Sequence, residues 1–115
     1  MRIVIKKNES NAVIITFHTH IERFDSDYER SKFFRELHGW KQVVPGNEKS
    51  YSYRRSGFLD EVPHMKIADS VFMVAQERIK EVVKFFDEWE NKVDYDMMHV
   101  KVVEEKIMKM LDALD

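Results

Sequence analysis

Apolar and polar positions divide the start of the chain into two strand-like runs. Residues 2–6 and 12–18 are rich in β-branched and apolar side chains, and the polar segment 7–11 separates them. Such runs predict a hairpin of two strands. The second run is apolar on both faces, which is typical of an interior strand. We expect it to be covered on both sides by its own chain, or by helices on one side and a partner on the other.

A helix is predicted to follow, because the apolar positions now recur with helical spacing. Ser26 and Glu29 have the spacing of a capping box, in which each side chain bonds a backbone N–H at the helix start. Gly39 is well suited to end the helix. The pattern therefore predicts a helix over 26–38.

The rest of the chain continues to alternate between strand-like and helical patterns. In order, we expect strands at 40–44 and 49–55, a structured loop over 57–66, a strand at 70–74, a helix over 76–91, a strand at 94–103 and a helix over 104–114. Pro45-Gly46 favours a type II turn between the first two of these strands, since proline presets its first central position and glycine allows the positive φ of the second.

The predicted order is β-β-α-β-β-β-α-β-α. Without the first strand and the last helix, it is close to the ferredoxin-like β-α-β-β-α-β order. We therefore predict one α+β domain over residues 1–115, with an antiparallel or mixed sheet and two helices on one face. This fold hosts many unrelated activities and does not indicate a function by itself.

Composition narrows the functions that the chain can have. It contains no cysteine, which excludes disulfides, thiol catalysis and thiolate metal sites. Its apolar runs fall well short of the roughly 20 residues that span a bilayer, and its start lacks the pattern of a signal peptide. We expect a cytoplasmic protein without a membrane partner and without a cofactor.

Charge is unevenly distributed, although the net charge is only −2. Residues 30–66 carry eight basic and four acidic side chains, whereas residues 67–115 carry seven basic and twelve acidic ones. The middle of the chain therefore favours an anionic partner.

The segment 40–55 combines aromatic rings with cations, as single-stranded nucleic acids require. Bases stack on rings while arginine and lysine hold phosphates. An alternative is ordinary strand patterning, in which the two tyrosines face the core and the serines face water. The candidate polyanion-binding residues are Arg30, Lys32, Arg35, Lys41, Lys49, Tyr51, Tyr53, Arg54 and Arg55.

His18 and His20 form a second candidate site. Two histidines two residues apart on a strand point the same way and can bind one metal ion, with a carboxylate such as Glu22 or Asp25. The pair resembles the His-hydrophobic-His motif of relaxase and transposase nucleases over three residues. Thr19 replaces the apolar residue of that motif, and no tyrosine lies on the two later predicted helices. We therefore do not assign the chain to that family.

The loop from Asp60 to His64 is a third candidate, since it places two carboxylates near an imidazole, as a general base oriented by an acid requires. The other interpretation is a loop histidine that caps a backbone group. Asp94 and Asp96 could flank a cation, or form the solvated face of an edge strand.

The predicted C-terminal helix is too short to persist alone in water and must pack on its own sheet or on a second subunit. Four methionines nearby in sequence suit an adaptable contact, and we expect a homodimer. These methionines are Met97, Met98, Met108 and Met110.

Three hypotheses follow from these patterns. The first is a non-catalytic module that binds RNA, DNA or another polyanion through the basic segment 30–66. The second is a homo-oligomeric structural or regulatory protein assembled through its methionine-rich C-terminal strand and helix. The third is a metal-dependent hydrolase or nuclease that uses His18 and His20. We favour the first over any enzyme.

Overall fold

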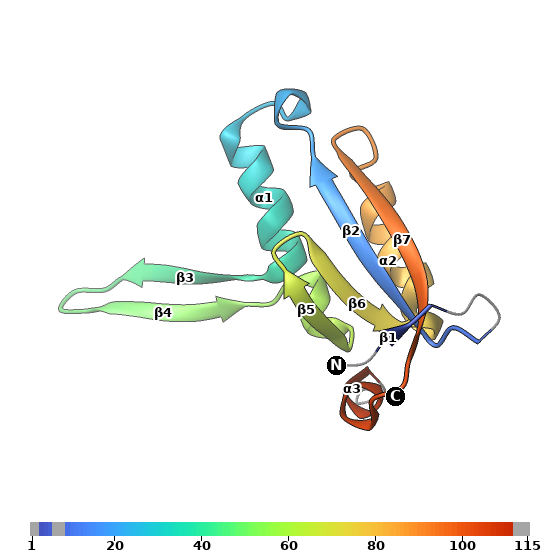
Figure 1. The fold of residues 1–115 in the computed structure, drawn as a ribbon. Helices are drawn as coiled ribbons and strands as arrows, with labels where there is room; N and C mark the ends of the chain where they lie inside the picture. The colour runs from blue at the N-terminus through green and yellow to red at the C-terminus, as the bar shows by residue number, and fades with distance from the viewer. Residues whose placement is uncertain (1–2, 6–8, 112–115) are drawn as a thin grey trace. The chain divides into compact units, whose positions relative to one another are not determined.

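A computed structural model describes residues 3–5 and 9–111 of the chain (Figure 1). Its contacts fall into two compact units. The sheet unit consists of the described residues within Met1–Arg23 and Val62–Asp115, and the ribbon unit of Phe24–Glu61. The helices within the described ranges are too short or too polar to cross a bilayer.

The sheet unit is built on a five-stranded antiparallel sheet in the order β1-β7-β2-β6-β5. The strands are β1 (Ile3–Val4), β2 (Ala12–Thr19), β5 (His64–Ala68), β6 (Val71–Ala75) and β7 (Val93–Val102). Because β2 pairs with β6 on one side and with β7 on the other, the predicted interior strand is confirmed.

Helix α2 (Ile79–Asp87) packs on one face of this sheet (Figure 1). Its Phe86 side chain is fully buried, with ring centroids 5.4 Å from Phe17 of β2 and 6.3 Å from Phe72 of β6. A 3-10 turn over Gln76–Arg78 precedes the helix, and turns replace the last part of the predicted 76–91 helix.

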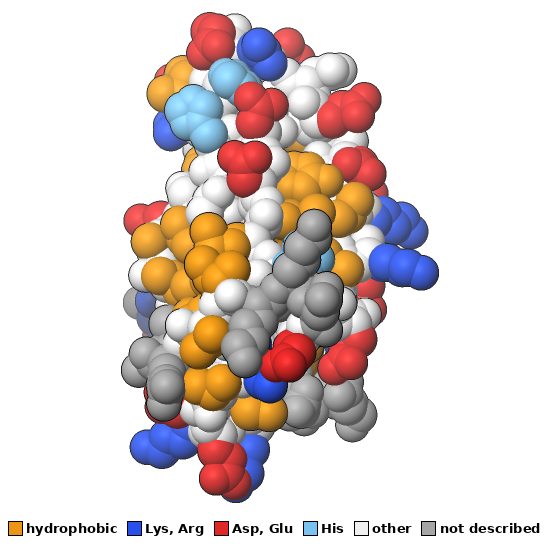
Figure 2. All heavy atoms as spheres, turned by 45° about the vertical axis from the view of Figure 1, so that its right-hand side comes forward, with side chains coloured by type: hydrophobic (Ala, Val, Ile, Leu, Met, Phe, Trp, Pro, Cys, Tyr) orange, Lys and Arg blue, Asp and Glu red, His pale blue; other side chains and the backbone are white. Residues whose placement is uncertain are grey.

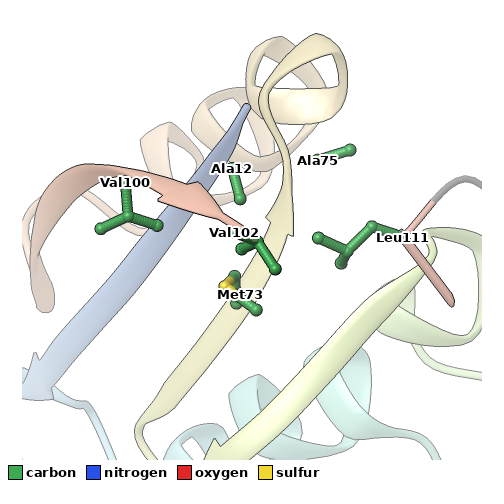
Figure 3. Packing of buried hydrophobic residues seen from close by; sticks show 6 residues of the cluster. All are labelled: Ala12, Met73, Ala75, Val100, Val102 and Leu111. Atoms are coloured by element: carbon green, nitrogen blue, oxygen red, sulfur yellow. The ribbon is translucent and has the colours of Figure 1, made fainter. Parts of the chain in front are cut away.

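A second cluster of buried side chains lies on the opposite face, since successive residues of a strand point to opposite sides. In Figure 3 the Leu111 side chain of α3 (Glu105–Leu111) extends toward Val102 of β7. The buried residues of this cluster are Ala12, Met73, Ala75, Val100, Val102 and Leu111. The last helix thus packs on its own sheet, as one of the two predicted alternatives required. The rest of the predicted 104–114 helix lies outside the described residues.

The ribbon unit joins α1 (Asp27–His38) to a two-stranded antiparallel sheet of β3 (Trp40–Pro45) and β4 (Ser50–Arg55). The predicted cap of α1 is confirmed, because the Ser26 hydroxyl accepts a 3.2 Å hydrogen bond from the Glu29 N–H. Gly39 ends the helix with a φ of 79°, a conformation that glycine adopts without strain. A 3-10 turn over Phe58–Glu61 follows the ribbon.

Three local predictions were wrong. Residues of β1 pair with β7 rather than with β2, because β2 already has neighbours on both sides. β5 begins at His64, inside the predicted loop 57–66, because its short alternating pattern directly follows Pro63 and did not indicate a strand. The type II turn is absent, since Gly39 is the one residue in the described ranges with a positive φ. The Gly46 N–H instead donates to the Lys49 carbonyl at 2.9 Å and closes a wider loop.

The structure is therefore α+β, with an antiparallel sheet and three α-helices among the described residues. The ferredoxin-like arrangement is not confirmed. The predicted strands 40–44 and 49–55 form a separate two-stranded sheet instead of joining the core sheet. Helix α1 belongs to the ribbon unit, whereas α2 belongs to the same unit as the five-stranded sheet.

Candidate polyanion-binding site

The β3–β4 ribbon has two distinct faces, which follow from its register. Trp40 lies opposite Arg55, Gln42 opposite Tyr53 and Val44 opposite Tyr51. Paired residues of antiparallel strands project to the same side. These six residues form one side, called the ring face below. The other side of the ribbon carries Lys41, Val43, Pro45, Ser50, Ser52 and Arg54.

Both central rings of the ring face are open to solvent. Tyr51 is 48% exposed and Tyr53 is 49% exposed, and every residue of β4 is exposed. The alternative in which these tyrosines face the core is therefore wrong within the ribbon unit. Alternation along a strand only separates its two faces, and it does not decide which face is buried.

Cations lie over the rings of this face. The Lys49 Nζ is 5.5 Å from the Tyr51 ring centroid, and the Arg55 Cζ is 5.7 Å from that of Tyr53. The Arg35 guanidinium of α1 stacks over Trp40 at 4.5 Å. Such contacts contribute about 0.5–1 kcal/mol each at exposed sites, and they keep positive charge beside each ring.

A hollow of about 220 Å³ opens at the base of the ribbon. The Trp40 side chain lines it together with Lys32 and Arg35 of α1. Tyr28, Glu36 and Ser56 complete the lining. Sequence reasoning missed these three residues, although the i, i+4 and i+8 spacing of Tyr28, Lys32 and Glu36 places them on one side of a helix.

Arg54 has a structural position that the sequence did not reveal. Its guanidinium donates to the His38 carbonyl and to the Asp60 carboxylate, each at 2.9 Å, and also to the Arg55 carbonyl. The same Asp60 oxygen accepts the Gly57 N–H at 2.7 Å. Arg54 thus ties β4 to the end of α1 and to the turn after the ribbon.

The nine predicted residues are therefore not brought together as one patch. Arg35, Lys49, Tyr51, Tyr53 and Arg55 share the ring face or border it, and Lys32 lies in the hollow. Lys41 and Arg54 lie on the other side of the ribbon. Arg30 is about 200° around α1 from Lys32, and its guanidinium packs 5.7 Å from the Phe34 ring centroid.

The positive charge is also more local than the sequence indicated. Residues 24–61 contain seven basic and seven acidic side chains, because Asp25, Asp27 and Glu29 belong to the same unit. Residues 40–55 contain four basic side chains and one acidic one. Within this unit, the excess of positive charge thus lies in the ribbon rather than in the whole segment 30–66.

His18 and His20 lie close together at the end of β2, with ring centroids 5.0 Å apart. The His20 Nε2 contacts the Asp94 carboxylate of β7, and its Nδ1 lies 3.5 Å from Glu22. Both ring nitrogens of His20 therefore already have a carboxylate neighbour. No group of three or more potential ligands with metal-binding geometry is found in 3–5 and 9–111. Asp25, the other proposed ligand, belongs to the ribbon unit.

The hydrogen bond from His20 lowers the pKa of Asp94 below its ordinary value of 3.8. The positive charges of His20, Arg23 and His18 act in the same direction, and partial desolvation opposes them. This contact joins the last residues of β2 to the start of β7, where the His20 N–H also donates to the Lys92 carbonyl at 2.8 Å. His20 thus acts as a clamp between the end of β2 and the start of β7.

The loop histidine has a backbone partner. The His64 Nδ1 lies 2.9 Å from the Val62 carbonyl oxygen, as a capping role requires. Asp60, the proposed acid of this loop, is bound to Arg54 and Gly57. The two residues thus have separate partners.

Comparison with known proteins adds no assignment: no family model, curated protein or solved structure matches this chain.

Proposed function

We propose that this protein is a non-catalytic module that binds single-stranded nucleic acid through the ring face and the hollow at its base. The observation that carries this proposal is the exposure of Tyr51 and Tyr53 on one side of the ribbon, each with a cation over its ring.

The tyrosines supply the stacking surface. Residues two apart on a strand lie about 6.8 Å from each other, which leaves room for one base on each ring. Stacking of a base on an aromatic side chain contributes about 1–3 kcal/mol and tolerates any base. We therefore expect weak sequence preference and a requirement for unpaired bases.

The cations supply the contacts to phosphates. Lys49 and Arg55 flank the two rings, and Arg35 lies beside Trp40 where the hollow begins. A guanidinium can also stack on a base, so that Arg55 can contact a base that enters beside Tyr53. The strand would run along the ribbon with its phosphates toward these side chains.

The same geometry gives no comparable support to a hydrolase. His20 has two carboxylate neighbours, Glu22 and Asp94, and each of its ring nitrogens faces one of them. A general base or a metal ligand needs one nitrogen with an available lone pair.

Fluorescence anisotropy with labelled oligonucleotides tests the proposal. The wild-type chain should bind a single strand of about a dozen nucleotides, a length within the range that small binding folds cover. It should bind a duplex of equal length more weakly. The affinity should fall with salt, and the double variant Tyr51→Ala, Tyr53→Ala should lose about 2–4 kcal/mol of binding free energy.

A matched control distinguishes the effect of removing a cation from the ribbon from the effect of removing a cation elsewhere. Arg55→Ala should weaken binding and reduce the salt slope by roughly 0.7 for one lost phosphate contact. Lys80→Ala removes the same charge from an exposed position of α2 and should change neither quantity. Equal losses in the two variants, or tyrosine variants that bind like wild type, would contradict the proposal.

A further inference from the structure

Among residues 3–5 and 9–111, strand β7 has one edge without a neighbouring strand along most of its length. It pairs with β2 from Val93 to Val100, but with β1 only at Lys101 and Val102. Within the part of the chain that the structure describes, residues 93–100 therefore have a neighbouring strand on one side only. Figure 2 brings this side of the sheet forward and shows hydrophobic side chains gathered at mid-height, below the histidines and acidic residues.

The backbone groups of this edge alternate in direction. His20 donates its N–H to Lys92, and in an antiparallel pair every second residue bonds the same neighbour. The even-numbered residues from 94 to 100 therefore bond β2. Tyr95, Met97 and His99 direct their N–H and C=O groups outward, where a further strand can pair with them, whereas the Val93 N–H already donates to the Trp89 carbonyl at 2.9 Å.

Exposed apolar side chains accompany the outward backbone groups. Met97 is 42% exposed and Met98 is 49% exposed, and they point to opposite faces of the sheet. A strand that adds to this edge would cover a methionine on either face. Methionine adapts its shape to such a contact at little cost.

We propose that β7 pairs antiparallel with β7 of a second copy of this chain, about a two-fold axis at Met97. The interface would be the same surface on both copies, as two-fold symmetry requires. The sheet would then continue from one copy into the other.

The register follows from the sequence of the edge. Met97 is the midpoint of residues 94–100, so pairing about it stays within the stretch that has a neighbour on one side only among the described residues. A centre one residue earlier would place Asp96 opposite itself, and like charges directly opposite are destabilising. A centre one residue later would shorten the paired stretch to residues 96–100, because Tyr95 would then face Lys101, which already pairs with β1.

Pairing about Met97 also brings complementary groups together. Asp94 and Asp96 would lie opposite the apolar Val100 and Met98 of the second copy. Tyr95 would lie opposite His99 of that copy, twice per dimer. A hydrogen bond links the Tyr95 hydroxyl to the Asp87 carboxylate, and burial together with that negative charge raises the pKa of Tyr95. The His99 imidazole of one copy would thus approach the Tyr95 hydroxyl of the other, beside oxygen atoms that accept hydrogen bonds.

Symmetry makes the proposal testable at one position, because Met97 would face its own copy. The chain has no cysteine, so Met97→Cys introduces a single thiol. Directly opposite Cα atoms lie about 5.5 Å apart, within the range of roughly 4.4–6.8 Å that a disulfide spans. Mild oxidation of the full-length variant should therefore give a covalent dimer.

Met98→Cys is the matched control. Its exposure is similar, but the two copies of residue 98 would be offset by two positions, about 8 Å apart by strand geometry. Light scattering on the wild-type chain should give twice the 13.9 kDa chain mass. A wild-type monomer at the highest soluble concentration, or equal cross-linking of both variants, would overturn the proposal.

A charge pair checks the same axis without oxidation. Met97→Lys and Met97→Glu should each be monomeric, since each places like charges opposite one another, and an equimolar mixture should dimerise. Circular dichroism of each variant verifies that it is folded. Folded variants that stay monomeric when mixed, beside a dimeric wild type, would refute this register.

Discussion

Arg54→Ala should uncouple the ribbon from α1 without removing a ligand contact. The wild-type guanidinium donates to the His38 carbonyl and to Asp60, each at 2.9 Å. Alanine deletes these bonds and leaves the Asp60 carboxylate with the Gly57 N–H. We therefore expect a change in stability that is concentrated in the ribbon unit.

The magnitude can be estimated from the exposure of the pair. The side chains of Arg54 and Asp60 are 54% and 39% exposed, so their ion pair contributes at most about 1 kcal/mol after solvent screening. The bond to the His38 carbonyl adds about 0.5–1.5 kcal/mol. Arg54→Ala should thus lower the free energy of unfolding of the ribbon unit by about 1–2 kcal/mol.

Native-state hydrogen exchange is the appropriate measurement, since it resolves local stability. Amides of β3 and β4 should exchange roughly 5–30-fold faster in Arg54→Ala, while amides of β2 should not change. Adding Asp60→Asn to the same chain should produce little further effect, because the two residues act on one contact.

Arg55→Ala is the control for this prediction. Its Nε donates to Gln42 at 2.6 Å and its guanidinium lies over Tyr53, both on the ring face. It should weaken oligonucleotide binding more than it accelerates exchange. If Arg54→Ala left exchange unchanged and weakened binding as Arg55→Ala does, the anchoring role of Arg54 would be refuted.

Three further predictions concern the helix end, the core and the strand clamp. Gly39→Ala should lower stability by about 1–3 kcal/mol in urea unfolding, because a Cβ there would lie 2.5 Å from the Arg55 carbonyl at a φ of 79°; an unchanged midpoint would contradict this. Phe86→Ala should cost about 3–5 kcal/mol in the same assay, since its side chain is fully buried; a loss below 1 kcal/mol would mean that α2 does not pack as described. The pKa of Asp94 is lowered by His20, so its contribution to stability should be complete above the ordinary value of 3.8 and be lost as the pH falls through the lowered value. Carboxyl NMR titration should show this low pKa, and His20→Ala should raise it; the same pKa in both proteins would exclude the clamp.

Local signals made part of this fold predictable. The Ser26 and Glu29 spacing identified the start of α1, and the apolar run over 12–18 identified the central strand. Both depend on residues that are adjacent or nearly adjacent in sequence. The stripe that includes Phe86 located α2 for the same reason.

The composition of the ribbon could be predicted, but its surroundings could not. Alternation of tyrosine and serine is the same whether one face is buried or both are exposed, so periodicity left the direction of Tyr51 and Tyr53 open. The exposure of every β4 side chain in the folded chain decides it.

The role of Arg54 was hidden for a different reason. A cation in a basic segment looks like a ligand contact until its partners are known, and the His38 carbonyl is sixteen residues away. Nothing in the local pattern distinguishes Arg54 from Arg55, which has the same type of side chain and a different set of neighbours.

The division into two units has a consequence for how the chain is synthesised. The ribbon unit is one continuous segment, Phe24–Glu61, inserted between the two parts of the sheet unit. Its contacts can therefore form as soon as that segment leaves the ribosome. Ala12 of β2 pairs with Ala75 and with Val100, so the central strand gains its two neighbours only after residues 75 and 100 have been made. Contacts this distant in sequence slow folding, and the apolar strand β2 would stay without partners while the ribbon unit forms.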